Sequence, residues 1–242
     1  LSAFPWCLPR CLPQMNALLF VEYAAVCNRS EVKPVLSGAM GGYCPLCRDS
    51  SLALIHEAVD GVPWRLYDSG CSPRAALRFF RCSNCDLTIK DPAVRANWEQ
   101  QRAHYVKHNN DVQEEGYRSH LLKLLAPVLR AVSGAAIGLD YGCGPNVSIE
   151  VLAEERGVKC HSYDPHFFPS RENLRESAFD FITCSEVSEH FSDPRREFER
   201  LRWMLKPRGV LGVMTHVVPE DFQSWWYHRD PTHVVFYSER AF

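Results

Sequence analysis

The segment from Ala135 to Arg156 constrains the fold of this chain more than any other. An apolar run over 135–139 leads into Asp140-Tyr141-Gly142-Cys143-Gly144-Pro145-Asn146, and a helix-like stretch, Val147–Arg156, follows. Glycines lack a Cβ atom, so the chain can turn tightly there and a ligand can approach the backbone closely. A strand, a glycine-rich turn and a helix in this order open a nucleotide-type binding site, although an isolated G-x-G also occurs in ordinary strand-to-helix connections.

Downstream of this turn, strand-like and helix-like segments alternate. A helix is predicted after Asp193, which is a suitable N-cap and is followed by Pro194 at the first helical position. Alternation of this kind is typical of a parallel α/β sheet. The strands are expected at 135–140, 158–163, 179–184 and 209–215.

The glycine turn fits one kind of cofactor better than another. A dinucleotide fold requires a third glycine, in G-x-G-x-x-G, where this chain has Val147. The turn instead resembles motif I of class I S-adenosylmethionine-dependent methyltransferases, D-x-G-x-G-x-G, with Asn146 in place of the last glycine. Asp164 comes at the end of the second expected strand, after the helix that follows the turn. A carboxylate at that position can accept hydrogen bonds from both ribose hydroxyls of a cofactor.

Two further stretches are similar to the same family, so that the resemblance covers about 135–216. Phe179–His190 resembles its fourth strand and the following turn, and Leu201–Thr215 resembles the helix, K-P-x-G turn and fifth strand. The resemblance implies a Rossmann-like, mostly parallel α/β sheet that binds S-adenosylmethionine. It implies cofactor contacts from Asp140, Gly142, Gly144, Asp164 and Cys184.

The family's active site lies after the fourth strand, which favours Glu186 and His190 as catalytic residues. His233 is the third candidate, because it belongs to the aromatic-rich stretch 225–233, which is placed to cover a methyl acceptor. Core packing is the alternative for Trp225 and Trp226. Methyl transfer is an in-line displacement, so positioning can supply most of the acceleration. A base is needed only where the acceptor must lose a proton. For both histidines a structural hydrogen-bonding role is an equal alternative.

Two features depart from the family. Between Asp164 and Asp180 the family usually has a helix, a third strand and a connection, but the stretch 165–179 is too short for all three. The third strand is therefore expected to be missing or vestigial. The chain also stops at Phe242, before the family's final strand pair is evident, which suggests C-terminal truncation. Asn146 in the glycine turn and the short 165–179 stretch make a degenerate, non-catalytic adaptor an alternative to an enzyme.

Four of the eleven cysteines form two C-x-x-C pairs, with the long stretch 48–81 between them. Four thiolates on two tight turns predict a closed, structural zinc site, with inert core cysteines or a redox pair as alternatives. Cys71 and His56, in the intervening loop, are possible substitute ligands. The expected ligands are Cys44, Cys47, Cys82 and Cys85.

Four regions are expected. Residues 1–39, which show no periodicity, are an extension or a disordered tail, and 40–92 form a small β-rich zinc-knuckle module with strands at 64–67 and 77–81. Residues 93–133 form a helical connector, with helices at 93–108 and 116–132. Its stretches 105–110 and 115–117 resemble a segment that leads into the methyltransferase domain in zinc-knuckle members of the family, which implies that they can close over the cofactor bound by 134–242, the methyltransferase domain. The alternative is that 108–110 simply end a helix.

Composition limits the partners. The formal net charge is −2, and from Gly134 onward 12 Lys/Arg stand against 17 Asp/Glu, whereas 40–133 has 12 against 10. A nucleic-acid partner usually requires a basic stripe, so a small-molecule acceptor is favoured over a ribosomal or transfer RNA. No apolar run is long enough to span a bilayer, so no membrane span is expected. Metal-binding cysteines suit a reducing cytoplasm.

Overall fold

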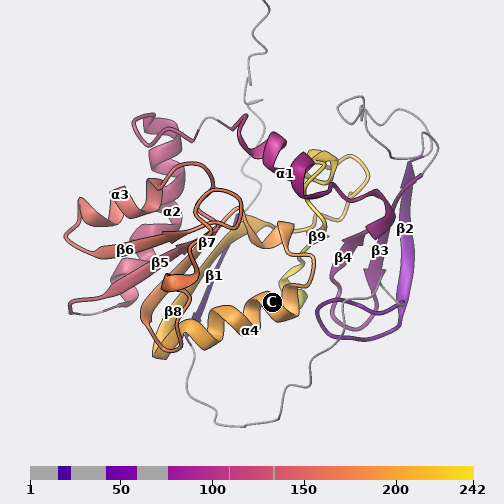
Figure 1. Ribbon diagram of the computed structural model, residues 1–242. Coiled ribbons are helices and arrows are strands. Elements are labelled where there is room, and N and C mark those ends of the chain that lie inside the picture. The colour runs from indigo at the N-terminus through magenta and orange to yellow at the C-terminus, as the bar shows by residue number, and fades with distance from the viewer. Residues whose placement is uncertain (1–15, 23–41, 59–75, 109, 133) are drawn as a thin grey trace, which may run out of the picture.

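The strands predicted downstream of residue 134 are the parallel centre of a five-stranded sheet in the computed structural model (Figure 1). The order is β1-β8-β7-β5-β6, and β1 runs antiparallel to β8. The α/β class and the Rossmann-like parallel arrangement are therefore confirmed. The strands are β1 (Asn16–Glu22), β5 (Ile137–Tyr141), β6 (Lys159–Tyr163), β7 (Phe179–Ser185) and β8 (Leu205–His216). The structure describes residues 16–22, 42–58, 76–108, 110–132 and 134–242.

Helices cover both faces of this sheet. Helices α2 (Glu115–Ala131) and α3 (Ser148–Glu154) pack on one face, and α4 (Pro194–Met204) packs on the other. A Cβ atom added to Gly212 of β8 would lie 2.5 Å from Cγ2 of Val128, so this glycine lets α2 pack directly against the strand. Asp193 caps α4 as predicted, since its side chain accepts a hydrogen bond from the Arg196 amide.

The N-terminal cysteine pairs lie in turns next to a second sheet, which also contains part of the C-terminal segment. Its order is β2-β3-β4-β9, and β9 joins it by pairing with β4. The predicted strand at 77–81 is confirmed, whereas 64–67 lies outside the described residues. The expected domain boundaries stay predictions, but 40–92 and 134–242 share this sheet. Its strands are β2 (Leu52–Ala58), β3 (Leu77–Cys82), β4 (Thr88–Lys90) and β9 (Val235–Phe236).

Two regions bear on expectations from the sequence. Within 1–39, which was expected to be an extension or tail, residues 16–22 form β1 and extend the sheet beyond β8, and the rest lies outside the described residues. Between β6 and β7 the described residues contain no further strand, as expected from the short spacing, but only a 3-10 turn, η2 (Arg171–Asn173). The sheet therefore ends at β6.

The expected connector helix at 93–108 is shorter in the structure. Helix α1 (Trp98–Tyr105) begins at a capping box in which Asn97 and Gln100 exchange hydrogen bonds, and a 3-10 turn, η1 (Pro92–Val94), precedes it. Figure 1 shows α1 above the space between the two sheets. The remaining 3-10 turns are η3 (Ser188–His190), η4 (Trp226–Arg229) and η5 (Glu239–Ala241).

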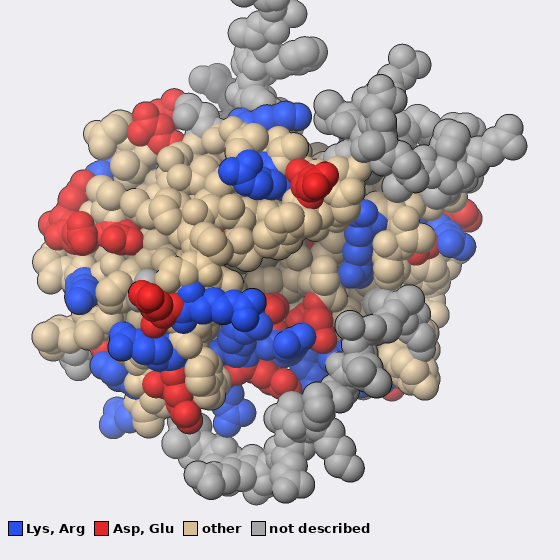
Figure 2. Space-filling model, viewed as in Figure 1, with Lys and Arg blue, Asp and Glu red and all other residues tan. Residues whose placement is uncertain are grey.

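Charges of both signs are present on the face of the molecule that Figure 2 presents. Figure 2 shows Lys and Arg side chains next to Asp and Glu side chains on the face it presents. Across the described part of the chain, no helix combines the length and the apolar character that a bilayer crossing requires.

Candidate active site

The turn between β5 and α3 has the conformation that its glycines allow. Gly142 and Gly144 have φ of +86° and +68°, in the left-handed region that side chains with a Cβ atom rarely adopt. The amides of Gly142 and Cys143 donate to the Tyr163 carbonyl at 2.7 and 3.1 Å. These bonds fix the turn to the end of β6, beside Asp164.

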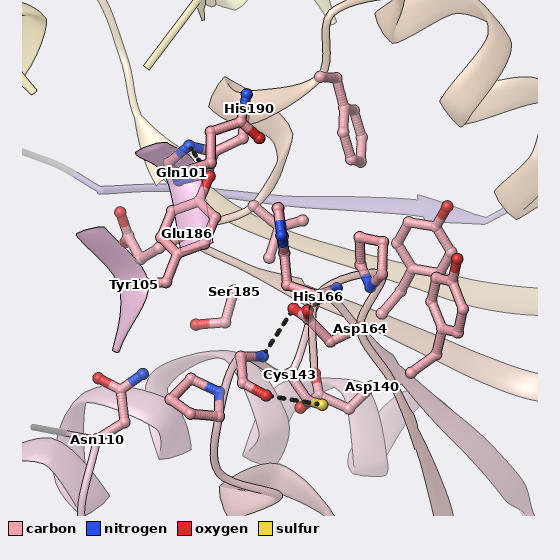
Figure 3. A pocket seen from close by; sticks show the side chains of 18 of the residues that line it. Gln101, Tyr105, Asn110, Asp140, Cys143, Asp164, His166, Ser185, Glu186 and His190 are labelled. Carbon is pink, nitrogen blue, oxygen red and sulfur yellow. Dashed lines mark hydrogen bonds between the residues drawn. The ribbon is translucent and has the colours of Figure 1, made fainter. Parts of the chain in front are cut away.

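The carboxylate of Asp164 holds the glycine turn in place and points toward that turn in Figure 3. Oδ2 accepts from the Gly144 amide at 3.0 Å, and Oδ1 accepts from the amides of His166 and Phe167 at 2.8 and 3.1 Å. A carboxylate offers about four acceptor positions. Three are therefore used within the protein, which leaves room for one further donor such as a ribose hydroxyl.

Asp140 lies beneath the same turn and is 4% exposed. Its Oδ1 accepts from Thr183 Oγ1 at 3.0 Å. Burial, together with the nearby negative charge of Asp164, raises the pKa of Asp140 to about 7. The carboxyl is therefore partly protonated near neutral pH in the cofactor-free protein.

This pKa gives a testable dependence of stability on pH. Because the folded-state pKa of Asp140 lies above its ordinary value of 3.8, the stability linked to it is complete below about pH 4 and is lost as the pH rises through about 7. A difference of about 3 between the two pKa values corresponds to at most ~4 kcal/mol. We expect Asp140→Asn to raise the free energy of unfolding at pH 8, with a gain that shrinks toward pH 5. Parallel pH profiles of the two proteins in chemical denaturation would contradict this.

A cavity of about 740 Å³ opens above the carboxyl ends of the parallel strands. The glycine turn and Asp164 form one part of its wall, and Figure 3 places Glu186 and His190 across from them. Residues from α1 and the start of α2 complete it. Its lining includes Gln101, Tyr105, His108, Asn110, Tyr117, His120, Asp140, Gly142, Gly144, Asp164, His166, Ser185, Glu186, His190, Asp193 and His233.

The segment between α1 and α2 is held over the glycine turn by direct bonds. The Asn110 carbonyl accepts from Asn146 Nδ2 at 3.2 Å and from Ser148 Oγ at 3.0 Å. The ring of Trp98, in α1, stacks on His166 with centroids 3.7 Å apart. Asn146, which replaces the third motif glycine, therefore connects the turn to the segment that was predicted to cover it.

Two glutamates, Glu186 and the fully buried Glu189, lie close together after β7. Tyr227 Oη is 3.0 Å from Glu186 Oε2 and 2.5 Å from Glu189 Oε1, and Thr215 Oγ1 donates to Glu189 Oε2 at 2.9 Å. Glu189 is fully buried, and burial followed by the charge of Glu186 raises its pKa to about 8. Glu186 itself has φ of +54°, and its amide donates to the Met214 carbonyl at 2.8 Å.

The two candidate histidines lie together at this pair. Their ring centroids are 4.8 Å apart. His190 Nδ1 donates to the Thr232 carbonyl at 3.0 Å, and His233 Nδ1 donates to the Tyr227 carbonyl at 2.9 Å. Burial lowers the pKa of both rings. Both are therefore neutral near pH 7, with the Nε2 lone pair unprotonated.

Comparison with known proteins identifies the family of this chain. Residues 113–242 match a family model described as a methyltransferase domain. The chain belongs to this methyltransferase family.

Two curated relatives match shorter stretches. Over 99 residues the chain is 31% identical to a ubiquinone biosynthesis O-methyltransferase of Histophilus somni (strain 2336). The aligned stretch covers 39% of this chain and 41% of that protein. Over 89 residues it is 32% identical to the uncharacterized methyltransferase YcgJ of Bacillus subtilis (strain 168), covering 34% and 35% of the two chains. The chain thus spans about two fifths or less of the length of these relatives.

Solved structures show weaker similarity. The crystal structure of Bacillus YcgJ superimposes with a TM-score of 0.36 at 24% identity, over 50% of this chain and 64% of that one. A S-adenosylmethionine-dependent methyltransferase from Thermotoga maritima gives a TM-score of 0.36 at 16% identity, over 57% and 75%.

Most residues singled out from the sequence meet at the cavity of this methyltransferase domain. Four of the five expected cofactor contacts line it, as do the three catalytic candidates. Cys184 is the exception: it is fully buried in β7, in the core that packs against α4, and it does not line the cavity. Cys184 therefore occupies a core position, apart from the residues that line the cavity.

Two residues of this acidic cluster, Glu189 and Tyr227, were not predicted as site residues from the sequence. The sequence motifs do not single out Glu189, although its spacing of three from Glu186 in a tight turn indicates that both carboxylates can face one way. The sequence predicts Tyr227 only as part of an aromatic cover, whereas its hydroxyl lies between the two carboxylates.

The four paired cysteines come together as predicted, away from the cavity. The Sγ atoms of Cys44 and Cys85 are 3.5 Å apart, as are those of Cys47 and Cys82, and none of the four forms a disulfide. His56 instead stacks on Phe79 at 5.9 Å, and Cys71 lies outside the described residues.

Proposed function

We propose that this protein transfers the methyl group of S-adenosylmethionine to a small-molecule acceptor held in the 740 Å³ cavity. The main support for this proposal is that the expected cofactor contacts and the catalytic candidates line the same cavity. The glycine turn and Asp164 offer a cofactor site at one part of it, and Glu186, His190 and His233 offer acceptor contacts at another. The cofactor supplies an activated methyl group, and the protein holds both reactants in line.

The residues at the acceptor end of the cavity can also accept a proton from the acceptor. Where the acceptor is a hydroxyl or an amine, the unprotonated Nε2 of His190 or His233 can take its proton. The interleaved surface charges and the cover formed by α1 support a small molecule over a nucleic acid. The ubiquinone biosynthesis O-methyltransferase, named for a small-molecule pathway, agrees with that choice.

Binding of the cofactor tests the proposal. Titration calorimetry of the full chain with S-adenosylmethionine should show one site. Asp164→Ala should weaken it about 10- to 150-fold, since hydrogen bonds to charged groups contribute ~1.5–3 kcal/mol. The matched variant Glu154→Ala removes an exposed carboxylate at the end of α3 and should bind normally. Absence of binding to the folded wild-type protein would favour a non-catalytic adaptor.

The cysteine cluster is proposed to hold a structural zinc ion. Its Sγ–Sγ separations of 3.5 Å are close to the ~3.8 Å edge of a tetrahedron with Zn–S bonds of about 2.3 Å. Four thiolates leave no open position, so this metal would stabilise the module and take no part in the transfer. Free thiols of this kind suit a reducing compartment such as the cytoplasm.

A further inference from the structure

The acceptor end of the cavity contains a second group of metal-ligating side chains. One ligand atom from each of Glu189, His190 and His233 lies within 4.8 Å of the others. The two imidazoles line the cavity, and the Glu189 carboxylate is buried behind them. The group therefore forms a buried three-sided cradle whose fourth side faces the acceptor space.

Both imidazoles are oriented as metal ligands usually are. Each donates its Nδ1–H to a backbone carbonyl, His190 to Thr232 and His233 to Tyr227. Such a bond fixes the tautomer and the ring orientation, so that the Nε2 lone pair is presented to the opposite side. The Nε2 of His190 lies 4.0 Å from Glu189 Oε1. Two ligands on one ion at about 2.1 Å are ~3.4 Å apart at a tetrahedral angle and at most ~4.2 Å apart, so the two side chains would move slightly closer to share an ion.

The hydrogen bonds of the described residues do not satisfy both carboxyl groups of Glu186 and Glu189. The Tyr227 hydroxyl has a single proton, yet it lies within hydrogen-bonding distance of both Glu186 and Glu189. The other oxygen of Glu186, Oε1, is buried without a hydrogen-bond partner among the described residues, with His120 Nε2 at 3.6 Å. The second carboxyl group must therefore be matched either by a proton of its own or by a cation between Glu189 and the histidines.

We propose that Glu189, His190 and His233 bind a divalent first-row transition cation, with Glu186 close enough to hold a water ligand of that ion. Two imidazoles and one carboxylate are a donor set that suits such ions and leaves coordination positions open. The open positions face the cavity. The natural further ligand is therefore an oxygen of the methyl acceptor.

This assignment rests on the proposed function and narrows its acceptor to a molecule with a metal-binding oxygen, such as a vicinal diol or an enediol. With both Nε2 atoms bound to the cation, the histidines no longer accept the acceptor's proton; a hydroxyl bound to the cation instead loses its proton to solvent more readily. The resulting oxygen forms a bond to the methyl carbon, while the carbon–sulfur bond breaks and its electron pair leaves with S-adenosylhomocysteine.

Manganese(II) tests the site without requiring the acceptor. The full chain, first loaded with one equivalent of zinc, is titrated with Mn²⁺ and the free ion is followed by electron paramagnetic resonance. We expect one Mn²⁺ per chain. Glu189→Gln and His190→Asn should each weaken it at least ~10-fold, whereas Glu199→Gln, which removes an exposed carboxylate of α4, should not. His190→Asn keeps the test valid if Glu189→Gln does not fold.

Parallel titrations separate this inference from the proposed function. Asp164→Ala should lose S-adenosylmethionine binding and keep the Mn²⁺ site, and Glu189→Gln should show the reverse. The metal site would be overturned if the folded wild-type protein bound S-adenosylmethionine but no Mn²⁺. It would also be overturned if Glu189→Gln and His190→Asn both kept the wild-type affinity for Mn²⁺. Mn²⁺ binding without S-adenosylmethionine binding would support the site and contradict the methyltransferase proposal.

Discussion

Replacing Cys82 by serine is expected to remove the zinc ion and to disturb the acceptor end of the cavity as well as the module. Cys82 is fully buried, and it packs with Cys44, Leu87 and Ile89 against the segment around Val235. Structural zinc contributes about 10–16 kcal/mol to folding in small zinc modules, so loss of one ligand should unfold the module locally. Metal analysis should fall from one equivalent of zinc toward none.

The disturbance should reach the cavity through the C-terminal segment. The Lys90 amide donates to the Val234 carbonyl, and the Val234 amide donates to the Glu189 carbonyl, both at 2.9 Å. The Tyr237 hydroxyl donates to the Ser188 carbonyl at 2.9 Å. We therefore expect faster hydrogen exchange at Val234 in Cys82→Ser.

A second cysteine variant is the control for this experiment. Cys160→Ser alters a buried cysteine of β6, outside the cluster, so it should keep the zinc ion. The exchange at Val234 should then match the wild type. Zinc retained at one equivalent in Cys82→Ser, with unchanged exchange, would refute a structural metal at this site.

The parts of the site that are local in sequence could be predicted. Gly142, Gly144 and Asp164 lie within one strand–turn–helix–strand unit, whose order fixes where each residue must lie. The hydrophobic pattern of 179–184 and the cap at Asp193 are local in the same sense. Each is determined by backbone conformation and by neighbours a few residues away, which is the information a single sequence carries.

The parts that depend on pairing across the chain could not be predicted. The register of β9 with β4 joins Thr88 to Phe236, and no local pattern indicates a partner so far along the chain. The meeting of His190 with His233 follows from that pairing, because β9 closely follows His233. The position of Cys184 could not be predicted for a different reason. Side chains alternate between the two faces of a strand, but this alternation does not tell which face turns toward the cavity.

Gly142→Ala is expected to cost more cofactor affinity than its single added methyl group suggests. Gly142 has φ of +86°, which costs a residue with a Cβ atom about 1–2 kcal/mol. The added Cβ would also lie 2.5 Å from Cγ1 of Val187, which adjoins Glu186. Either the turn or the Glu186 segment must move, and both line the cavity. We expect S-adenosylmethionine affinity to fall at least ~10-fold, equivalent to ~1.4 kcal/mol.

Gly157→Ala separates backbone strain from the contact with Val187. Gly157 also has positive φ, +73°, but an added Cβ there has no atom within 4 Å. It should lower the free energy of unfolding by about 1–2 kcal/mol and leave cofactor affinity unchanged. If the contact is the cause, Val187→Ala combined with Gly142→Ala should recover part of the lost affinity, because it removes both γ-carbons nearest the new methyl group. Equal losses in Gly142→Ala and Gly157→Ala would instead assign the effect to global destabilisation.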